Sequence, residues 1–322
     1  AIGAALLYLE EARLEPLKAN TWDELFVREN KEKTYGYPPL TLALSSYPEF
    51  TTSASYLYKP GGNAAAIEVD IYQPPKEKQN VYLGIDIGST STKAVLINSR
   101  NDVLIGLYTQ TAGQPVKAVQ AIFEAIDDIA RKHGCEFVFD GVGTTGSGRK
   151  FIGRIINADL IIAEITAHAR AAYELNSEAD TIIEIGGQDA KFTTMKNGMV
   201  TSSVMNNVCA AGTGSFIEEQ AVKLGVSLAD YSGRAMNTPS PISSDRCTVF
   251  MERDINNYLT EGYSVDEVLA SVLHSVCENY LAKVAVEANI GQSVCFQGAT
   301  ARNRALVAAF EHRLKKPIFV SR

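Results

Sequence analysis

Residues 81–92 read VYLGIDIGSTST, an apolar run that ends in a glycine and a series of hydroxyl side chains. Such a run is typical of a buried strand that enters a polar turn, and residues 93–97 read as the strand that leaves the turn. Periodic apolar positions then predict a helix over 115–133, a strand over 137–142 and a helix over 163–175. This alternation predicts an α/β lobe.

Residues 181–195 read TIIEIGGQDAKFTTM and repeat this design. A strand over 181–185 runs into a turn that contains two glycines, and a second strand follows over 190–195. The remainder of the chain from residue 209 is mostly helical in pattern, with one apolar strand over 293–296. Two lobes of the same design predict a duplicated α/β fold that holds a ligand in a cleft between its halves.

The predicted division of the chain has four parts. They are a helical segment over 1–19, a linker over 20–80 with at most a few strands (40–44 and 67–71), a first α/β lobe over 81–184 and a second lobe over 185–322. Proline pairs and a charged run interrupt the periodicity of the linker, which is why no helix is predicted there.

Composition argues against several classes of protein. A chain of 322 residues with 46% hydrophobic residues can bury a sizeable core, and its formal net charge of -7 disfavours binding to nucleic acid or anionic lipid. No stretch approaches the roughly 20 apolar residues that span a bilayer, so the expected location is the cytoplasm. Five cysteines at wide spacings indicate thiols, core residues or metal ligands, not a disulfide framework.

The first turn carries the residue types of a phosphate site. Gly88 allows backbone amides to approach an anion, the hydroxyls of Ser89 and Thr90 add donors, and Lys93 offsets phosphate charge. Asp86, at the end of an apolar strand, is placed to hold a hydrated Mg²⁺. A hairpin turn with an incidental aspartate explains this turn equally well when it is taken alone.

The second turn favours the nucleotide interpretation. It repeats the glycine-rich polar pattern with Gly186, Gly187, Gln188 and Asp189. Two such turns, one in each lobe, are expected where a nucleotide lies between the lobes. The chain has no Walker loop.

Two cysteines stand directly before helical patterns. Cys209 precedes a pattern over 210–224 and Cys247 precedes one over 248–259. Helix N-termini stabilise negative charge such as a thiolate or an anionic cluster. A four-iron cluster normally takes four cysteines, so a second chain would have to supply two more. The alternative is that both are buried thiols, as most cysteines are.

Several motifs carry a resemblance to a known family. The most specific are NNVCAAGTG (206–214) and SSDRCTVF (243–250), and weaker ones are TGSGR (145–149), GGQDAK (186–191), GATARN (298–303) and the pair Glu164 and His168. With these motifs, residues 81–322 resemble the ATPase activators (activases) of 2-hydroxyacyl-CoA dehydratases and benzoyl-CoA reductases. That family lies in the superfamily of sugar kinases, actin and heat-shock ATPases, which implies ribonuclease-H-like lobes.

The resemblance implies an ATP-dependent reductive activator. A [4Fe–4S] cluster shared by the two chains of a homodimer would accept an electron from a ferredoxin or flavodoxin. ATP binding and hydrolysis to ADP would then change the angle between the cluster-bearing helices and drive the electron into a partner iron–sulfur dehydratase or reductase.

The resemblance also implies a role for each matching residue. Asp86 would organise Mg²⁺ and the attacking water, Ser89, Thr90 and Lys93 the phosphates, Gln188 and Asp189 the second phosphate turn, Gly298 the adenosine, and Cys209 and Cys247 the cluster. The other cysteines, Cys135, Cys277 and Cys295, match no ligand of the family and are expected to be ordinary thiols.

The sequence departs from the family pattern in three places. Gln297 replaces the first of two glycines in the adenosine loop, and Glu184 stands where the family usually has aspartate. Family members end with a short small-residue helix, whereas this chain stops after a strand over 317–320 and instead begins with the similar stretch AIGAALL (1–7). We therefore expect a piece of a longer protein with tandem activase modules, which contains the tail of one module and nearly all of the next. Whether residues 1–19 complete the second lobe, in trans or by folding back, stays open from the sequence.

Two other functions remain open from the sequence. A small-molecule kinase of the same superfamily would pass the γ-phosphate to a hydroxyl and would need no iron. A noncatalytic regulatory module would bind nucleotide without turning it over. Iron analysis separates the first alternative from an activator, and single-turnover ATP hydrolysis separates the second.

Overall fold

The computed structural model describes residues 2, 6–7, 32–61, 64–206, 210–285 and 287–321. The chain divides into two compact units, residues 1–34 and residues 35–322, and the fold described below is that of the second unit. The helix expected over 1–19 falls almost wholly outside the described residues, and so does Cys209.

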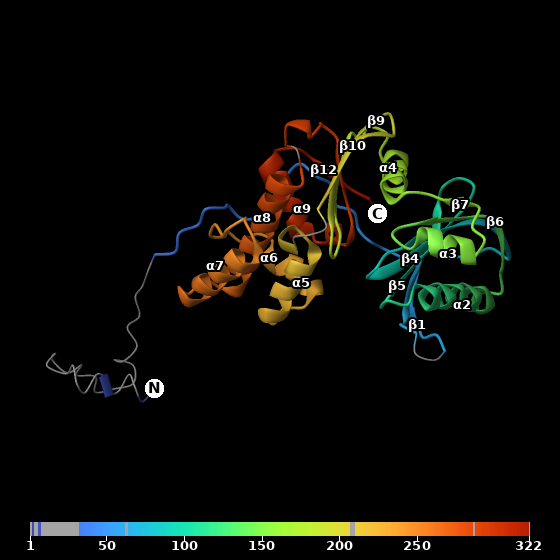
Figure 1. Ribbon diagram of the computed structural model, residues 1–322, viewed down its shortest axis with the longest axis horizontal. Coiled ribbons are helices and arrows are strands. Elements are labelled where there is room, and N and C mark those ends of the chain that lie inside the picture. Colours follow the sequence, from blue (N-terminus) through green and yellow to red (C-terminus); the bar gives the residue numbers. More distant parts are fainter. Residues whose placement is uncertain are drawn as a thin grey trace. The chain divides into compact units, whose positions relative to one another are not determined.

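Among the described residues, the first sheet has seven strands in the order β1-β2-β5-β4-β3-β6-β7. Its strands and helices, in chain order, are β1 (Ala54–Tyr58), β2 (Ile67–Ile71), β3 (Lys78–Ile87), β4 (Ser91–Ile97), β5 (Val103–Gln110), α2 (Pro115–His133), β6 (Glu136–Thr145), α3 (Arg149–Ile155) and β7 (Leu160–Ile161) (Figure 1). The central strand β3 is antiparallel to β4 and parallel to β6. The turn after β3 is therefore held by neighbours on both sides.

Period-two burial along β3 builds the core of the first lobe. Val81, Leu83, Ile85 and Ile87 are buried while the residues between them are more exposed. The buried face of α2 packs in the same cluster. That helix has a proline in its first turn and ends where Gly134 adopts a left-handed φ of 59°.

A long helix, α4 (Glu164–Leu175), follows the first sheet and leads to the second. The second sheet contains β8 (Thr181–Ile185), β9 (Ala190–Lys196), β10 (Met199–Asn206), β11 (Val294–Gln297) and β12 (Ile318–Val320), in the order β10-β9-β8-β11-β12. Its helices are α5 (Gly214–Lys223), α6 (Leu228–Ala235), α7 (Thr248–Thr260), α8 (Val265–Lys283) and α9 (Arg304–Leu314), with 3₁₀ turns η2 (Ala210–Gly212), η3 (Glu287–Asn289) and η4 (Ala299–Arg302). β8 is antiparallel to β9 and parallel to β11, so its end repeats the setting of the end of β3.

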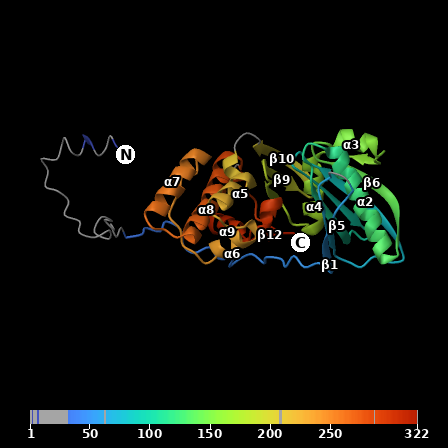
Figure 2. The same cartoon turned by 90° about the horizontal axis from the view of Figure 1, so that it is seen from below.

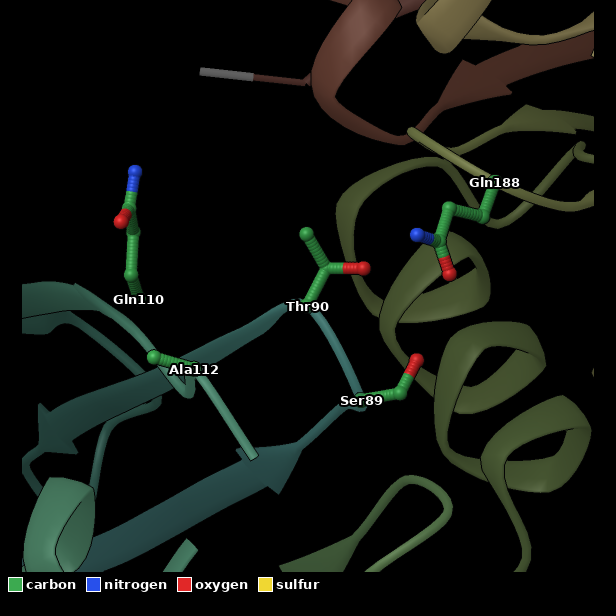
Figure 3. Close-up of a pocket in the computed structure, with 5 residues that line it drawn as sticks. All are labelled: Ser89, Thr90, Gln110, Ala112 and Gln188. Atoms are coloured by element: carbon green, nitrogen blue, oxygen red, sulfur yellow. The ribbon is translucent and has the colours of Figure 1, made fainter. Parts of the chain in front are cut away.

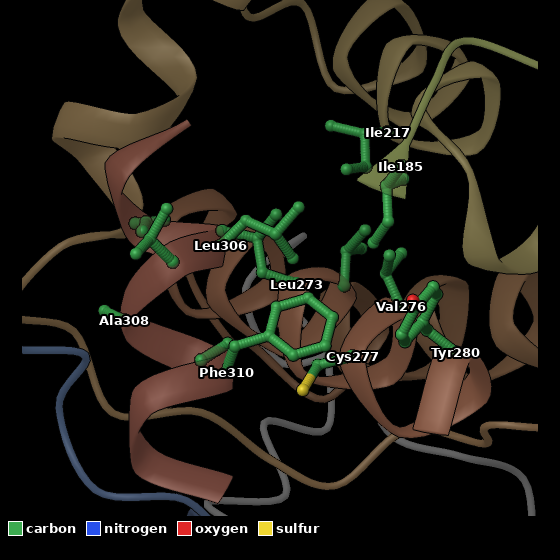
Figure 4. Close-up of a cluster of buried hydrophobic side chains, with 14 of the residues drawn as sticks. Ile185, Ile217, Leu273, Val276, Cys277, Tyr280, Leu306, Ala308 and Phe310 are labelled. Atoms are coloured by element: carbon green, nitrogen blue, oxygen red, sulfur yellow. The ribbon is translucent and has the colours of Figure 1, made fainter. Parts of the chain in front are cut away.

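The core of the second lobe is built around α8. Ser264 caps this helix in a reciprocal capping box with Glu267, and most of the helix is buried. Figure 4 shows Leu273, Val276 and Tyr280 from α8 beside Phe310 from α9. A helix with buried residues on nearly every side is expected at the centre of a lobe and not on its surface.

The segment that the sequence assigns to a linker carries two strands of the first sheet. The predicted strand over 67–71 is β2, and β1 pairs with it in an antiparallel register. Before β1, Leu40 forms only an isolated bridge with Met236 in place of the strand expected over 40–44. Figure 2 shows this blue segment passing α6 on its way to β1.

Most predicted elements are confirmed, and the bounds of α2 and β8 match the predicted ranges. Four of the described strands, β1, β5, β7 and β10, were not predicted. β5 carries Gly106 in its middle, which weakens a strand signal, and β10 is a largely exposed polar strand. Within the described residues, no helix is both long and apolar enough to cross a membrane.

Candidate functional site

The turn between β3 and β4 is closed by hydrogen bonds that require glycine. The N–H of Gly88 donates to the carbonyl of Ser91 at 3.0 Å, and a Cβ on Gly88 would lie 2.8 Å from that oxygen. The hydroxyl of Thr111, after β5, donates to the carbonyl of Gly88 at 2.8 Å. The turn is therefore fixed, while the side chains of Ser89 and Thr90 are exposed at its tip.

Asp86 lies at the base of this turn beside a cation. The ammonium of Lys93 is 3.4 Å from Asp86 Oδ2. On the other side, Gly146 has a φ of 83°, and a Cβ there would lie 2.4 Å from Asp86 Oδ1. Glycine at 146 therefore gives the Asp86 carboxylate its space, which explains one glycine of the TGSGR motif.

The turn between β8 and β9 has the same construction. The N–H of Gly186 donates to the carbonyl of Asp189 at 2.9 Å, and the start of α5 is tied to the turn because the N–H of Gly214 donates to the carbonyl of Gly186 at 2.9 Å. No described atom lies within 4 Å of a Cβ built on Gly187. The turn therefore presents an open backbone surface at this glycine.

The two turns meet across a cavity of about 390 Å³. Its lining residues are Ser89, Thr90, Gln110, Ala112 and Gln188 (Figure 3). In Figure 3 the Gln188 side chain extends toward the tip of the first turn. The structure thus brings Ser89 and Thr90 of the first turn to the same cavity as Gln188 of the second, about one hundred positions away in the sequence. The other predicted residues of the two turns are not among those that line it.

Gly298 adjoins the second turn. It has a φ of 93°, and a Cβ there would lie 2.3 Å from the carbonyl oxygen of Ile185, the last residue of β8. The hydroxyl of Thr300, in η4, donates to the same carbonyl at 2.8 Å. The loop predicted to contact adenosine is therefore fixed to the strand that carries the second glycine turn.

The second cysteine motif lies at a helix N-terminus. Cys247 directly precedes α7, with φ −151° and ψ 163°, and is half-buried. The next turn exposes two apolar side chains, with Val249 71% and Phe250 44% exposed. Cys247 is not among the residues that line the cavity between the turns, and its predicted co-ligand Cys209 lies outside the described residues.

Two of the remaining cysteines are core thiols, as expected. Cys277 and Cys295 are buried. Burial raises the pKa of both thiols, that of Cys295 to about 12, so neither has the thiolate character of a ligand. Cys135 is half-buried, and its pKa is also raised by burial.

Comparisons with known proteins agree with this geometry. Residues 83–321 match the model of the BadF/BadG/BcrA/BcrD ATPase family. The chain belongs to this family. The match spans both glycine turns, the loop that begins at Gly298 and both cysteine motifs, so the protein is an ATPase.

Curated relatives of this ATPase include named activators. This chain is 31% identical over 248 residues to the 2-hydroxyisocaproyl-CoA dehydratase activator of Clostridioides difficile, and the alignment covers 74% of this chain and 88% of the relative. It is 34% identical over 246 residues to the activator of lactoyl-CoA dehydratase of Anaerotignum propionicum, covering 74% and 90%.

Solved structures show the same fold. Component A of the Acidaminococcus fermentans (R)-2-hydroxyglutaryl-CoA dehydratase is 28% identical with a TM-score of 0.66, covering 76% of this chain and 92% of that one. The Clostridium difficile activator of 2-hydroxyisocaproyl-CoA dehydratase, solved with bound ADPNP, is 29% identical with a TM-score of 0.64, covering 75% and 88%. The predicted actin-like fold of two α/β lobes is confirmed.

The residues of this ATPase fit a nucleoside triphosphate with its metal ion. The hydroxyls of Ser89 and Thr90 and the side-chain amide of Gln188 line one cavity, and hydroxyl and amide groups can donate hydrogen bonds to phosphate oxygens. A carboxylate, Asp86, stands beside an ammonium, Lys93, and carboxylate oxygen is the ligand type that Mg²⁺ prefers.

A buried ion network behind the second turn was not predicted. The Lys191 side chain is 3% exposed, and its ammonium lies 2.9 Å from Glu184, 2.8 Å from Asp189 and 3.0 Å from Glu164. Burial alone would lower the pKa of Lys191, but the Glu184 charge and the hydrogen bonds of Asp189 and Glu184 outweigh it and raise that pKa. The ammonium thus fixes Asp189 of the glycine turn to the core.

His168 extends this network. Its Nδ1 lies 2.5 Å from Glu184 Oε2. Burial disfavours the imidazolium, but the hydrogen bond and charge of Glu184, with the charges of Glu164 and Asp86, raise the pKa of His168. Glu164, His168 and Glu184 are close enough to hold a metal ion, but Lys191 bonds to both carboxylates and supplies the cation itself.

Proposed function

We propose that this ATPase is an ATP-dependent reductive activator, which uses ATP hydrolysis to drive low-potential electron transfer into a partner iron–sulfur enzyme that acts on a CoA ester. Two features support the proposal. Relatives that are about 30% identical over most of their length are named activators of CoA-ester dehydratases. The observation that carries it in this chain is Cys247 at an exposed helix N-terminus, in the lobe that also carries the second glycine turn.

In this proposal, residues of both lobes bind the phosphates and orient the attacking water. Gly88, Ser89, Thr90 and Lys93 bind phosphate oxygens from the first lobe, while Gly186, Gly187, Gln188 and Asp189 bind them from the second. The amide of Gln188 and the carboxylate of Asp86 orient the attacking water, and Asp86 also holds the hydrated cation. When bound, Mg²⁺ supplies charge stabilisation for the transferring phosphoryl group.

Gly298 accepts the adenosine half of the nucleotide in the same proposal. A left-handed glycine with no side chain leaves the loop close to the end of β8, where a ligand that reaches from the phosphate turns would place its ribose and base. The turn at Gly187 and the loop at Gly298 are linked through Ile185, which immediately precedes the turn.

Cys209 and Cys247 would hold a [4Fe–4S] cluster together with the same pair from a second copy of the chain. Cys247 directly precedes α7, and the exposed Val249 and Phe250 give apolar surface for the second copy. A single chain supplies two thiolates, and a four-iron cluster takes four. When bound, the cluster supplies one-electron chemistry, with a ferredoxin or flavodoxin as donor.

Iron analysis tests this function. Protein isolated without oxygen should contain about four iron and four acid-labile sulfide atoms per two chains, and should be dimeric by light scattering. Cys247→Ser should lose the iron, whereas Cys135→Ser, a matched change at a half-buried thiol, should retain it. Stoichiometric iron in the double variant Cys209→Ser/Cys247→Ser would disprove the proposal.

A further inference from the structure

A strap, defined here as residues Tyr35–Tyr58, precedes the part of the chain that matches the family model. Its first half lies on the second lobe. Leu40 is fully buried in the core of that lobe, and its carbonyl accepts from the N–H of Asn237 at 2.9 Å. Tyr37 stacks on His274 with ring centroids 3.9 Å apart.

A buried carboxylate anchors the middle of the strap. Glu311, on α9, is 2% exposed. Its two oxygens accept the backbone N–H groups of Ala43, Leu44 and Ser45 at 2.6, 2.9 and 2.7 Å. Burial disfavours the charged form, but a hydrogen bond from the Ser45 side chain together with these backbone hydrogen bonds lowers the pKa of Glu311. Removal of the strap would leave a buried charge without these donors, so the strap is an integral part of the lobe.

The next residues of the strap contact the adenosine loop. The hydroxyl of Tyr47 donates to the carbonyl of Ala301, in η4, at 2.9 Å. Phe50 packs edge-on against Tyr47 with centroids 5.7 Å apart, and the guanidinium of Arg302 lies 5.5 Å from the centre of the Phe50 ring. Two consecutive loop residues are therefore held by two aromatic side chains of the strap.

The loop is thus held from two sides. On one side the hydroxyl of Thr300 ties it to β8, and on the other side Tyr47 ties it to the strap. Beyond Phe50, the strap continues into β1, whose pairing with β2 joins the first sheet. A single segment therefore connects the loop beside Gly298 to the lobe that carries Asp86.

We propose that Tyr47 and Phe50 of the strap are positioning residues for nucleotide binding, which hold the loop Ala299–Arg302 in the geometry that receives adenosine. The proposal rests on the proposed role of Gly298 and its loop. Loosening the loop weakens the binding of every ligand that contains adenosine. It leaves the phosphate turns in place, because their hydrogen bonds lie within the two lobes.

The test uses Tyr47→Phe and Phe50→Ala in the full chain, with Tyr35→Phe as a matched control. Tyr35 belongs to the same strap and donates a hydroxyl hydrogen bond to Glu267, away from the loop. Steady-state ATP hydrolysis should show KM for ATP raised about fivefold in Tyr47→Phe, the effect of one lost hydrogen bond, with kcat within about twofold of wild type. Tyr35→Phe should keep both values.

Competition separates positioning of adenosine from a general loss of structure. In Tyr47→Phe the inhibition constant of ADP should rise about fivefold, while that of inorganic tripolyphosphate, which has no adenosine, should stay the same. Equal weakening of both inhibitors, or an unchanged ADP constant in both strap variants, would overturn the proposal.

Gly298→Ala identifies which idea has failed. If this change raises the ADP constant while the strap variants do not, the strap proposal alone is wrong. If Gly298→Ala also leaves ADP inhibition unchanged in folded protein, then the adenosine loop has been misplaced, and both the strap proposal and that part of the proposed function fall together.

Discussion

Glu184 and Lys191 lie opposite each other in the β8–β9 pairing, with the ammonium of Lys191 2.9 Å from Glu184 Oε1. Both flank the glycine turn, one before it and one after it, so their ion pair closes the base of the turn. Lys191 also bonds to Asp189 within the turn. The geometry of the second glycine turn therefore depends on a buried charge that itself lies outside the cavity.

Lys191→Met should destabilise the fold strongly. It leaves the carboxylates of Glu164, Glu184 and Asp189 together without their shared cation, and removal of one partner from a buried ion pair costs about 3–5 kcal/mol. The free energy of unfolding in urea measures the loss. Lys223→Met is the matched control, since Lys223 also bonds to two carboxylates but is 42% exposed, and it should cost less than about 1 kcal/mol. Similar losses in the two variants would contradict the structural role of Lys191.

His168 should make stability depend on pH. Its folded pKa is raised above 6.5, so its contribution to stability is fully present below pH 6.5 and is lost as pH rises through the folded pKa. Because the pKa of Glu184 is lowered from 4.5, its carboxylate stays charged over this whole range of pH. The difference in unfolding free energy between wild type and His168→Gln should therefore be largest below pH 6.5 and shrink as the pH rises through the folded pKa of His168.

Glu184→Gln provides the control for this pH dependence. Without the carboxylate, the hydrogen bond and charge that raise the pKa of His168 are removed. The effect of His168→Gln should then vary much less with pH in the Glu184→Gln background. A pH dependence of the same size in both backgrounds would show that another group is responsible.

Asp86→Asn should separate binding from hydrolysis. An amide keeps the size of the side chain but is a poorer partner for a hydrated cation and a poorer acceptor for the attacking water. We expect ATP binding by calorimetry to persist while kcat falls about 100-fold, a typical effect of losing a positioned acid or base. Asp140→Asn, at an exposed position on β6 that bonds to Asn80, should keep wild-type turnover. Unchanged turnover in Asp86→Asn would exclude this residue as the organiser of hydrolysis.

Gly187→Val should weaken nucleotide binding without loss of stability. No described atom would touch its Cβ, so the branched side chain meets only the space that the phosphates need. The dissociation constant for ADP should rise at least about tenfold, since steric exclusion removes more than one hydrogen bond. Gly233→Val, at an exposed position of α6 with the same open surroundings among the described residues, is the matched control. Tight ADP binding in Gly187→Val would place the phosphates elsewhere.

The sequence determined the elements that depend on local order. The apolar run of β3 and the glycine after it predicted the first turn, and the periodic apolar face of α2 predicted that helix. These signals are local because side-chain alternation and backbone freedom at glycine act over a few residues. The repeat of one design at 181–195 was enough to predict two lobes with a cleft between them.

Only the tertiary structure decided what lies behind and beside the turns. Periodicity does not mark Lys191 as buried, because its burial also depends on Glu164 of α4, 27 positions away, and not only on Glu184 of the facing strand β8. Likewise, the hydrogen bond from Tyr47 to Ala301 joins residues 254 positions apart. A charge can be buried, and a strap can position a loop, only where distant segments supply the partners that offset desolvation, and those partners exist only in the folded chain.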